Sequence, residues 1–141
     1  MIILDTNVVS EPMKAKGASA VQAWLDRQAP ETLFLTSISL AELLLGIEAL
    51  PAGRRKAGLA EALTELLGNL FGTRILAFDA EAAKQSARLL GNARKRGRSI
   101  SMAGSQIAAI AATHGFIVAT RDTAPFEALG VAVINPWLTK P

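Results

Sequence analysis

The chain begins with a short apolar run, Ile2 to Leu4, that ends abruptly at Asp5. A run of this length closed by an acid predicts a buried β-strand with a carboxylate at its carboxyl end. In parallel α/β sheets, ligands and catalytic groups lie at that edge. A carboxylate there, joined by others from later in the chain, is a common way for proteins to hold a divalent metal ion. Asp5 therefore favours folds that bring further polar groups to the end of the first strand.

Composition narrows the class of protein. The chain has 141 residues, half of them apolar, and contains no cysteine. This length predicts one domain, residues 1–141, with enough chain to bury a core, and the apolar content argues against disorder. A chain without cysteine has neither a disulfide framework nor a thiolate metal site, which favours a reducing cytoplasm as its location.

No segment predicts export or membrane insertion. Asp5 interrupts the first apolar run at once, which does not fit a signal peptide. The apolar stretch from Ile38 to Ile47 carries polar residues and is shorter than the roughly 20 residues that cross a bilayer. The net charge of +3 and the pI of about 9.7 are compatible with a phosphate-bearing partner, but they do not identify one.

Strand-like and helix-like segments alternate along the whole chain. Short apolar runs predict strands at residues 2–4, 33–35, 74–78, 116–120 and 131–134. Apolar periodicity and capping residues predict helices at 18–28, 39–50, 79–96 and 102–113, a leucine-rich helix before 74, and a short helical piece at 125–127. This alternation predicts an α/β fold in which helices cover both faces of a parallel sheet.

Two adjoining helices in the first half of the chain carry most of the leucine. Residues 39–50 are apolar on most sides, which predicts a well-buried helix. Pro51 suits the first turn of the next helix. In that helix a stripe of leucines is expected to face the core: Leu59, Leu63, Leu66, Leu67 and Leu70.

Four positions would lie close together at one edge of such a sheet if the strands 2–4 and 116–120 are neighbours. Asp5 follows the first strand, and Asp122 follows the strand 116–120. Glu42 and Gly104 lie in what we expect to be the first turns of two helices. Carboxylates that share one site repel each other unless a cation compensates their charge. Mg²⁺ or Mn²⁺ suits hard oxygen ligands of this kind.

Each acid also has a purely structural interpretation. Asp5 and Asp122 are of a residue type that often forms turns after strands. Ser39 and Glu42 have the spacing of a capping box, in which the Glu42 side chain bonds to the Ser39 backbone N–H. From spacing alone the capping box is the stronger interpretation of Glu42, and only the combination of acids points to a metal site.

These motifs, taken together, resemble those of PIN-domain ribonucleases, and most closely the FitB-like branch of VapC toxins. The similarity extends over nearly the whole chain. The segments that carry it are LDTNVVSE (4–11), SLAEL (39–43), GI (46–47), LPAG (50–53), QIAAIA (106–111), HG (114–115), VATRD (118–122), Phe126 and INPW (134–137).

The resemblance implies both a fold and an activity. The fold is a PIN-like three-layer sandwich with about five parallel strands, in which the first and fourth are adjacent. The activity is that of a type II toxin that hydrolyses RNA with Mg²⁺ or Mn²⁺, with Asp5, Glu42 and Asp122 as catalytic acids and Asp5 and Asp122 as metal ligands. The expected partners are a second copy in a homodimer, a cognate antitoxin and, through a toxin–antitoxin hetero-oligomer, operator DNA.

One acid that the family pattern contains is missing. Relatives have an acid two residues after the position of Met102, where this chain has Gly104. Glycine has no side chain to bind a cation, and it weakens a helix by about 1 kcal/mol relative to alanine. Its neighbour Ser105 is neutral and points about 100° away around a helix. We therefore expect severely reduced RNA cleavage, because loss of a catalytic group can cost orders of magnitude in rate.

Residues near the acids suggest supporting roles. Thr6 and Thr120 stand next to the two strand ends, where they are expected to hydrogen-bond the carboxylates or a metal-bound water. Arg94, Arg96 and Arg98 cluster near the end of one helix. A phosphate-binding rim for RNA and a solvated helix end are equally good interpretations of these arginines.

Two functions of different kinds remain open. The first is a metal-dependent ribonuclease toxin with a damaged acidic site. The second, which Gly104 favours, is a catalytically inactive binding module that captures its antitoxin and acts as a co-repressor on operator DNA. A haloacid-dehalogenase-like phosphatase is disfavoured because Asn7 stands where its second aspartate belongs. A Rossmann-type protein is disfavoured because no Gly-x-Gly-x-x-Gly follows the first strand.

Overall fold

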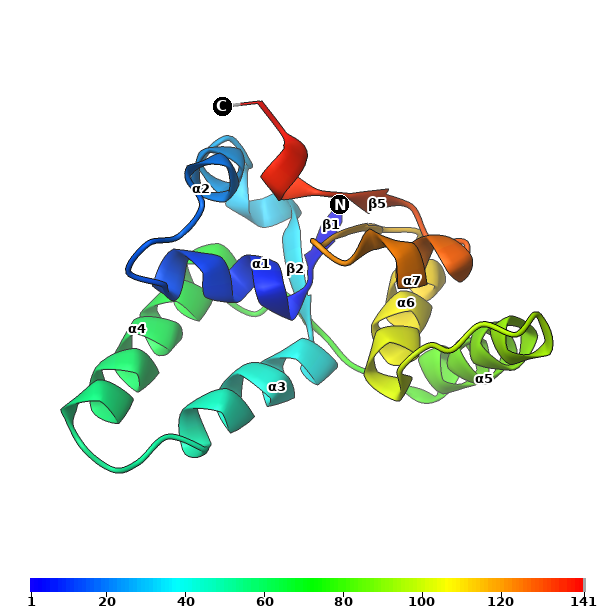
Figure 1. Cartoon of the computed structure of the whole chain (residues 1–141), viewed down its shortest axis with the longest axis horizontal. Coiled ribbons are helices and arrows are strands. Elements are labelled where there is room, and N and C mark those ends of the chain that lie inside the picture. Colours follow the sequence, from blue (N-terminus) through cyan, green and yellow to red (C-terminus); the bar gives the residue numbers. More distant parts are fainter. Residues whose placement is uncertain (141) are drawn as a thin grey trace.

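The computed structural model describes residues 1–140, and it places one parallel sheet between two groups of helices (Figure 1). The strands are β1 (Ile2–Leu4), β2 (Leu33–Thr36), β3 (Ile75–Leu76), β4 (Ile117–Ala119) and β5 (Val133–Ile134). The α-helices are α1 (Thr6–Ser10), α2 (Ser19–Asp26), α3 (Ser37–Glu48), α4 (Arg54–Leu70), α5 (Ala80–Lys95), α6 (Met102–His114) and α7 (Thr123–Ala128). Short 3-10 helices are η1 (Glu11–Met13), η2 (Pro30–Thr32) and η3 (Pro136–Leu138).

The sheet brings the two ends of the chain together. Its strand order is β3-β2-β1-β4-β5, and each pair of neighbouring strands is parallel. Leu4 of β1 is in register with Ala119 of β4. The predicted parallel sheet and the expected adjacency of the first and fourth strands are therefore confirmed. Because the strands are parallel, Asp5 and Thr120 follow their strands at the same carboxyl edge.

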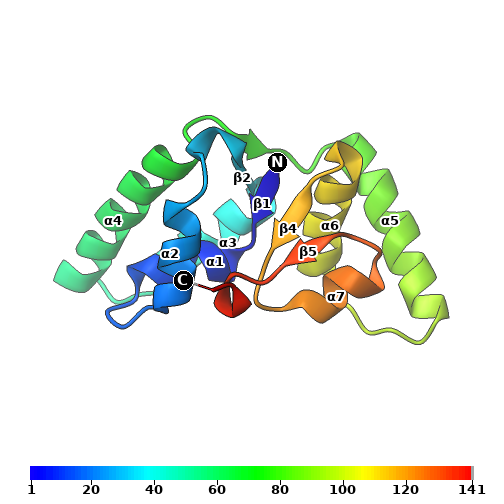
Figure 2. The same ribbon diagram turned by 90° about the horizontal axis from the view of Figure 1, so that it is seen from above.

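Alternate side chains of the central strands enter two separate hydrophobic cores. Leu4 and Ala119 pack into a core with residues of α1, α2 and α4, whereas Ile3 and Val118 pack into a core with residues of α5, α6 and α7. This division follows from the two-residue period of a strand. Figure 2 shows the two helix groups on opposite sides of the sheet. The expected three-layer arrangement is confirmed.

Four of the five predicted leucines of α4 face the first of these cores, whereas Leu59 is half-buried and does not belong to it. Leu63 is almost fully buried, and Leu66, Leu67 and Leu70 pack against the same cluster. Within residues 1–140, no helix is both long and apolar enough to span a bilayer.

Helix α3 is less buried than its sequence suggests. Its only buried residues are Ser39 and Leu43, and Leu45 is 69% exposed. The prediction of a well-buried helix is wrong because α3 lies across the carboxyl edge of the sheet, where it contacts β2, α1, α4 and α6 rather than covering a face (Figure 1). The expectation for Pro51 is also wrong, since α4 begins at Arg54 and Pro51 lies in the preceding loop.

Thr36, and not Ser39, caps α3. The Thr36 hydroxyl oxygen accepts a hydrogen bond from the Ser39 backbone N–H at 3.1 Å. The Ser39 hydroxyl is buried and has no hydrogen-bond partner among the described residues. The predicted capping box is therefore wrong, and Glu42 lies in the second turn of a helix that starts at Ser37. Asp79 and Ser101 cap α5 and α6, which agrees with the predicted starts of these two helices.

The hydroxyls of Thr36 and Ser39, near the start of α3, have different predicted effects on stability. We expect Thr36→Val to lower the free energy of unfolding by about 1 kcal/mol, because valine keeps the shape of threonine but removes the cap acceptor. Ser39→Ala is the matched control, and it should be neutral or slightly stabilising because it removes a buried hydroxyl without a partner. Urea denaturation of both variants checks this. A larger loss for Ser39→Ala than for Thr36→Val would contradict the assignment of the cap.

Candidate active site at the carboxyl edge of the sheet

Asp5 is held from two sides at the end of β1. Its Oδ1 accepts a hydrogen bond from the Thr6 backbone N–H at 2.8 Å, which caps α1. Its Oδ2 accepts a hydrogen bond from the Thr120 hydroxyl at 2.9 Å. Thr120 is fully buried at the end of β4. The Asp5 carboxylate therefore joins the ends of two adjacent strands, and the expected contacts of Thr6 and Thr120 with it are present.

The Thr120 hydroxyl also orders the loop that carries Asp122. It accepts the Asp122 backbone N–H at 3.0 Å and the Asn7 side-chain amide at 3.4 Å. The Asn7 side-chain Oδ1 accepts a hydrogen bond from the Arg121 backbone N–H at 3.3 Å. Sequence reasoning gave Asn7 no role in the site, because its partners lie more than a hundred positions away and meet it only once β1 and β4 pair.

Glu42 reaches the site from α3. The Thr6 hydroxyl donates a hydrogen bond to Glu42 Oε1 at 3.4 Å, and the Glu42 side chain is otherwise exposed. Thr6 therefore contacts both acids, through its backbone N–H and through its hydroxyl. Hydrogen bonds of Thr6 thus connect the Glu42 and Asp5 carboxylates, and those of Thr120 connect the Asp5 carboxylate to the backbone N–H of Asp122.

The carboxylates act on each other electrostatically. Burial raises the pKa of Asp5, the hydrogen bonds from Thr120 and Thr6 oppose this, and the charge of Asp122 raises the pKa further. Burial also raises the pKa of Glu42, and the charge of Asp5 adds to the effect. A cation placed beside these acids would reverse such shifts, because an opposite charge favours the ionised form.

We refer to Asp5, Glu42 and Asp122, with Thr6 and Thr120 between them, as the acidic row. The three acids do not form a preformed metal site. Across residues 1–140, no three His, Cys, Asp or Glu side chains lie together in a group that could hold one metal ion. The structure does bring Asp5 into electrostatic contact with Asp122 and with Glu42. All the charged donors in this row are hard carboxylate oxygens, which fit Mg²⁺ or Mn²⁺.

Gly104 lies in the first turn of α6, where its N–H donates to Ser101 Oγ at 3.0 Å. Because α6 leads directly into β4, the start of α6 lies toward the carboxyl edge. A Cβ atom at position 104 would be 2.9 Å from Ser101 Oγ and 3.8 Å from Ile100 Cγ2. The close contact is with the end of a rotatable side chain, so an aspartate requires only a small shift of Ser101.

Ser105 does not substitute for an acid at position 104. Its hydroxyl donates to the Met102 carbonyl oxygen at 2.7 Å and lies 3.3 Å from the Ser86 hydroxyl of α5. Ser105 is fully buried, so it faces the interior between α5 and α6.

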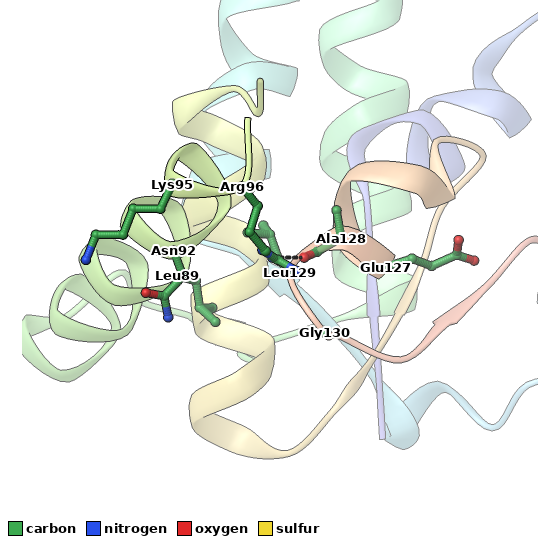
Figure 3. A pocket seen from close by; sticks show the side chains of 8 residues that line it. All are labelled: Leu89, Asn92, Lys95, Arg96, Glu127, Ala128, Leu129 and Gly130. Carbon is green, nitrogen blue, oxygen red and sulfur yellow. Dashed lines mark hydrogen bonds between the residues drawn. The ribbon is translucent and has the colours of Figure 1, made fainter. Parts of the chain in front are cut away.

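The predicted basic rim lies at the end of α5. Arg96 Nη2 donates to the Ala128 carbonyl oxygen at 2.7 Å, beside a pocket of about 560 Å³ between α5 and α7 (Figure 3). Lys95 extends away from this bond in the same view. Arg94 and Arg98 are exposed. Arg96 therefore ties α5 to α7, and an RNA-binding role for the three arginines stays a prediction.

The raised pKa of Asp5 predicts how the stability of the fold changes with pH. A carboxyl group whose pKa is higher in the folded state stabilises the fold below its unfolded pKa, and this contribution is lost as the pH rises through the folded pKa. We therefore expect the melting temperature of Asp5→Asn, relative to the unsubstituted chain, to rise between about pH 3 and about pH 7 in chelator-containing buffer. Thermal unfolding across that range checks this, and a difference that does not change with pH would contradict it.

Known proteins are similar to this chain in sequence and in fold. Residues 2–131 match the family model described as PIN domain. The chain is 50% identical over 138 residues to VapC ribonuclease Y4jK of Sinorhizobium fredii, covering 97% of this chain and 98% of that protein. It is 44% identical over 137 residues to Toxin FitB of Neisseria gonorrhoeae, covering 97% and 99%.

A solved structure of FitAB bound to an IR36 DNA fragment contains a chain of the same fold. That chain superposes with a TM-score of 0.94 at 42% identity, and the match covers 100% of this chain and 99% of the other. The chain belongs to the PIN-domain family, in the branch that contains the VapC and FitB proteins.

Proposed function

We propose that this protein is the toxin of a type II toxin–antitoxin pair and a metal-dependent endoribonuclease, and that Gly104 lowers its rate of RNA cleavage. The observation that carries the proposal is the placement of Asp5 between β1 and β4, linked through Thr120 to Asp122 and through Thr6 to Glu42. The names of its relatives, VapC ribonuclease and Toxin FitB, support the choice of RNA as substrate and of toxicity as outcome.

We assign Asp5 and Asp122 as the ligands of a Mg²⁺ or Mn²⁺ ion. Asp5 uses one lone pair of each carboxylate oxygen for Thr6 and Thr120, which leaves further lone pairs for a cation. The mutual repulsion of Asp5 and Asp122 is what such an ion would relieve. When bound, the ion supplies Lewis acidity toward phosphate oxygens and lowers the pKa of water.

Of the other residues in the acidic row, Thr120 positions the two metal-binding aspartates and Glu42 transfers a proton. Thr120 fixes Asp5 by donating to it and fixes the Asp122 loop by accepting from it. Glu42 is exposed and its pKa is raised, which suits a carboxylate that accepts a proton from water at Oε2 and returns it to the leaving oxygen. An acid at position 104 would add negative charge from the start of α6, and its absence weakens the hold on the cation.

Restoring the missing acid tests the proposal directly. We expect Gly104→Asp to raise the rate of Mg²⁺- or Mn²⁺-dependent RNA cleavage by about 10²-fold or more, the usual size of the effect of one electrostatic catalytic group. Gly104→Asn is the matched control, since it adds the same shape without the charge, and it should leave the rate unchanged. The measurement is cleavage of end-labelled RNA at equal protein concentrations, with and without chelator.

Two outcomes would count against this account. Equal rates for Gly104→Asp and Gly104→Asn would show that the missing carboxylate is not what limits cleavage. Full cleavage by Gly104→Asp after Asp5→Asn is added would show that the reaction takes place at another site.

The second candidate is a binding module that no longer cuts RNA. Gly104 favours it, and so does the structure of FitAB bound to DNA, in which a similar chain takes part in a complex on a DNA fragment. In this case the protein, as a homodimer in the cytoplasm, would bind its antitoxin and act as a co-repressor on operator DNA. The exposed Leu44 and Leu45 of α3 offer apolar surface for such protein partners.

Residual activity separates the two candidates. We expect the unsubstituted chain, at high concentration with Mn²⁺, to cleave RNA slowly and Asp5→Asn to abolish that cleavage, because Asp5 remains in place to hold the ion. Parallel gel-shift titrations of operator DNA with the antitoxin report co-repression. If the unsubstituted chain cleaves no faster than Asp5→Asn yet strengthens operator binding, the binding module is the correct function.

A further inference from the structure

One arginine that is next in sequence to an acid of the site has no part in the mechanism above. Arg121 immediately precedes Asp122, its side chain is exposed, and its backbone N–H is held by Asn7. Its guanidinium lies over the ring of Trp137, with Cζ 5.1 Å from the ring centroid. Trp137 belongs to η3, which contacts α2. The guanidinium therefore makes a cation–π contact with Trp137, and the packing of η3 against α2 holds that ring in place.

Glu11 adds an electrostatic restraint on the same guanidinium. Glu11 is buried, its Oε2 is 2.9 Å from Lys14 Nζ, and its Oε1 accepts the Ala18 backbone N–H at 3.0 Å. These two bonds lower the pKa of Glu11 most, and the charges of Lys14 and Arg121 lower it further. The Glu11 carboxylate thus attracts Arg121, while its Oε1 accepts a hydrogen bond from Ala18 and its Oε2 forms an ion pair with Lys14 but accepts no hydrogen bond.

The hydrogen-bonding capacity of Arg121 remains unused. Within residues 1–140, its guanidinium forms neither an ion pair within 4.0 Å nor a hydrogen bond. The contact with Trp137 uses none of the five guanidinium N–H donors, so the planar fork can still match the oxygens of a phosphate. A cation that is restrained by an aromatic ring and keeps its donors unused is suited to binding an anion.

We propose that Arg121 binds a phosphate of the RNA backbone next to the phosphodiester that the acids act on. This inference rests on the proposed ribonuclease function. RNA must approach an edge that carries Asp5, Glu42 and Asp122, and the uncompensated charge of these acids repels its phosphates. Arg121 supplies positive charge at the position adjacent to Asp122, so it draws the strand to the acids and sets its register. It acts as a substrate-positioning residue, while the acids carry the chemistry.

The test is equilibrium binding of a fluorescent single-stranded RNA to the full chain in Mg²⁺ buffer at several salt concentrations. We expect Arg121→Gln to raise Kd about tenfold and to reduce the slope of log K against log salt by about 0.7, the value for one lost phosphate contact on a single strand. Arg121→Lys keeps the charge and should keep the salt slope, with a Kd between the two, because it loses the planar fork.

Arg88→Gln is the matched control. Arg88 is an exposed arginine on α5 that bonds only Gln85 among the described residues, so this variant makes the same change in net charge away from the acids. It should alter neither Kd nor the salt slope. Thermal unfolding with and without Mn²⁺ shows whether each variant is folded and still responds to the ion.

Each other outcome overturns the inference in a recognisable way. If the unsubstituted chain binds RNA and Arg121→Gln binds it with the same Kd and slope, Arg121 has no phosphate role and the proposed function stands. If a parallel titration with the antitoxin shows that Arg121→Gln weakens antitoxin binding while RNA binding is unchanged, the partner of the guanidinium is a protein carboxylate and not RNA. If neither the unsubstituted chain nor Arg88→Gln binds RNA, the proposed function and this inference fail together.

Discussion

The hydrogen bond from the Thr120 hydroxyl to the Asp5 carboxylate is the contact on which the candidate site depends. It joins residues 115 positions apart in sequence, at the ends of two strands that are neighbours only in the finished sheet. Burial and the nearby Asp122 raise the pKa of Asp5 and so disfavour its charged form, whereas the hydrogen bonds from Thr120 and Thr6 favour that form. A cation would favour the charged form further, and Thr6 and Thr120 hold the carboxylate in position for it.

The position of Gly104 clarifies how the fold tolerates the missing acid. The N–H of Gly104 still completes the Ser101 cap, so α6 begins as it should without a side chain at that position. Removing one of several mutually repelling carboxylates also lowers the electrostatic cost of the site. The expected loss is therefore in metal binding and cleavage rather than in folding, and a scaffold that still binds partners remains compatible with both candidate functions.

The sequence was sufficient to predict the features that repeat locally. Apolar runs located β1 and β4, and the rule that parallel strands end at one edge put Asp5 and Thr120 at the same edge. That the two strands are neighbours was expected only from the resemblance to PIN domains. The start of α3 was misjudged because Ser39 and Glu42 have capping-box spacing, whereas Thr36 is also the last residue of β2 and shows no separate signal. The apolar residues of α3 suggested burial, but Leu44 and Leu45 lie at an edge of the sheet, where they remain 49% and 69% exposed. Asn7 and Arg121 were missed because their contacts depend on strand pairing and on Trp137. The catalytic and metal-binding roles, and the boundary of the domain at residues 1–141, stay predictions.

The proposed function requires that Asp5 and Asp122 share one divalent cation at the carboxyl edge of the sheet. A crystal structure of the unsubstituted chain with saturating Mn²⁺, in which anomalous scattering locates the ion, tests this directly. We expect an anomalous peak about 2.2 Å from carboxylate oxygens of both Asp5 and Asp122, a distance typical of small hard cations and oxygen ligands. A peak bound elsewhere, or Asp5 bonded to Thr120 with no ion beside it at saturation, would show that the two acids do not share an ion.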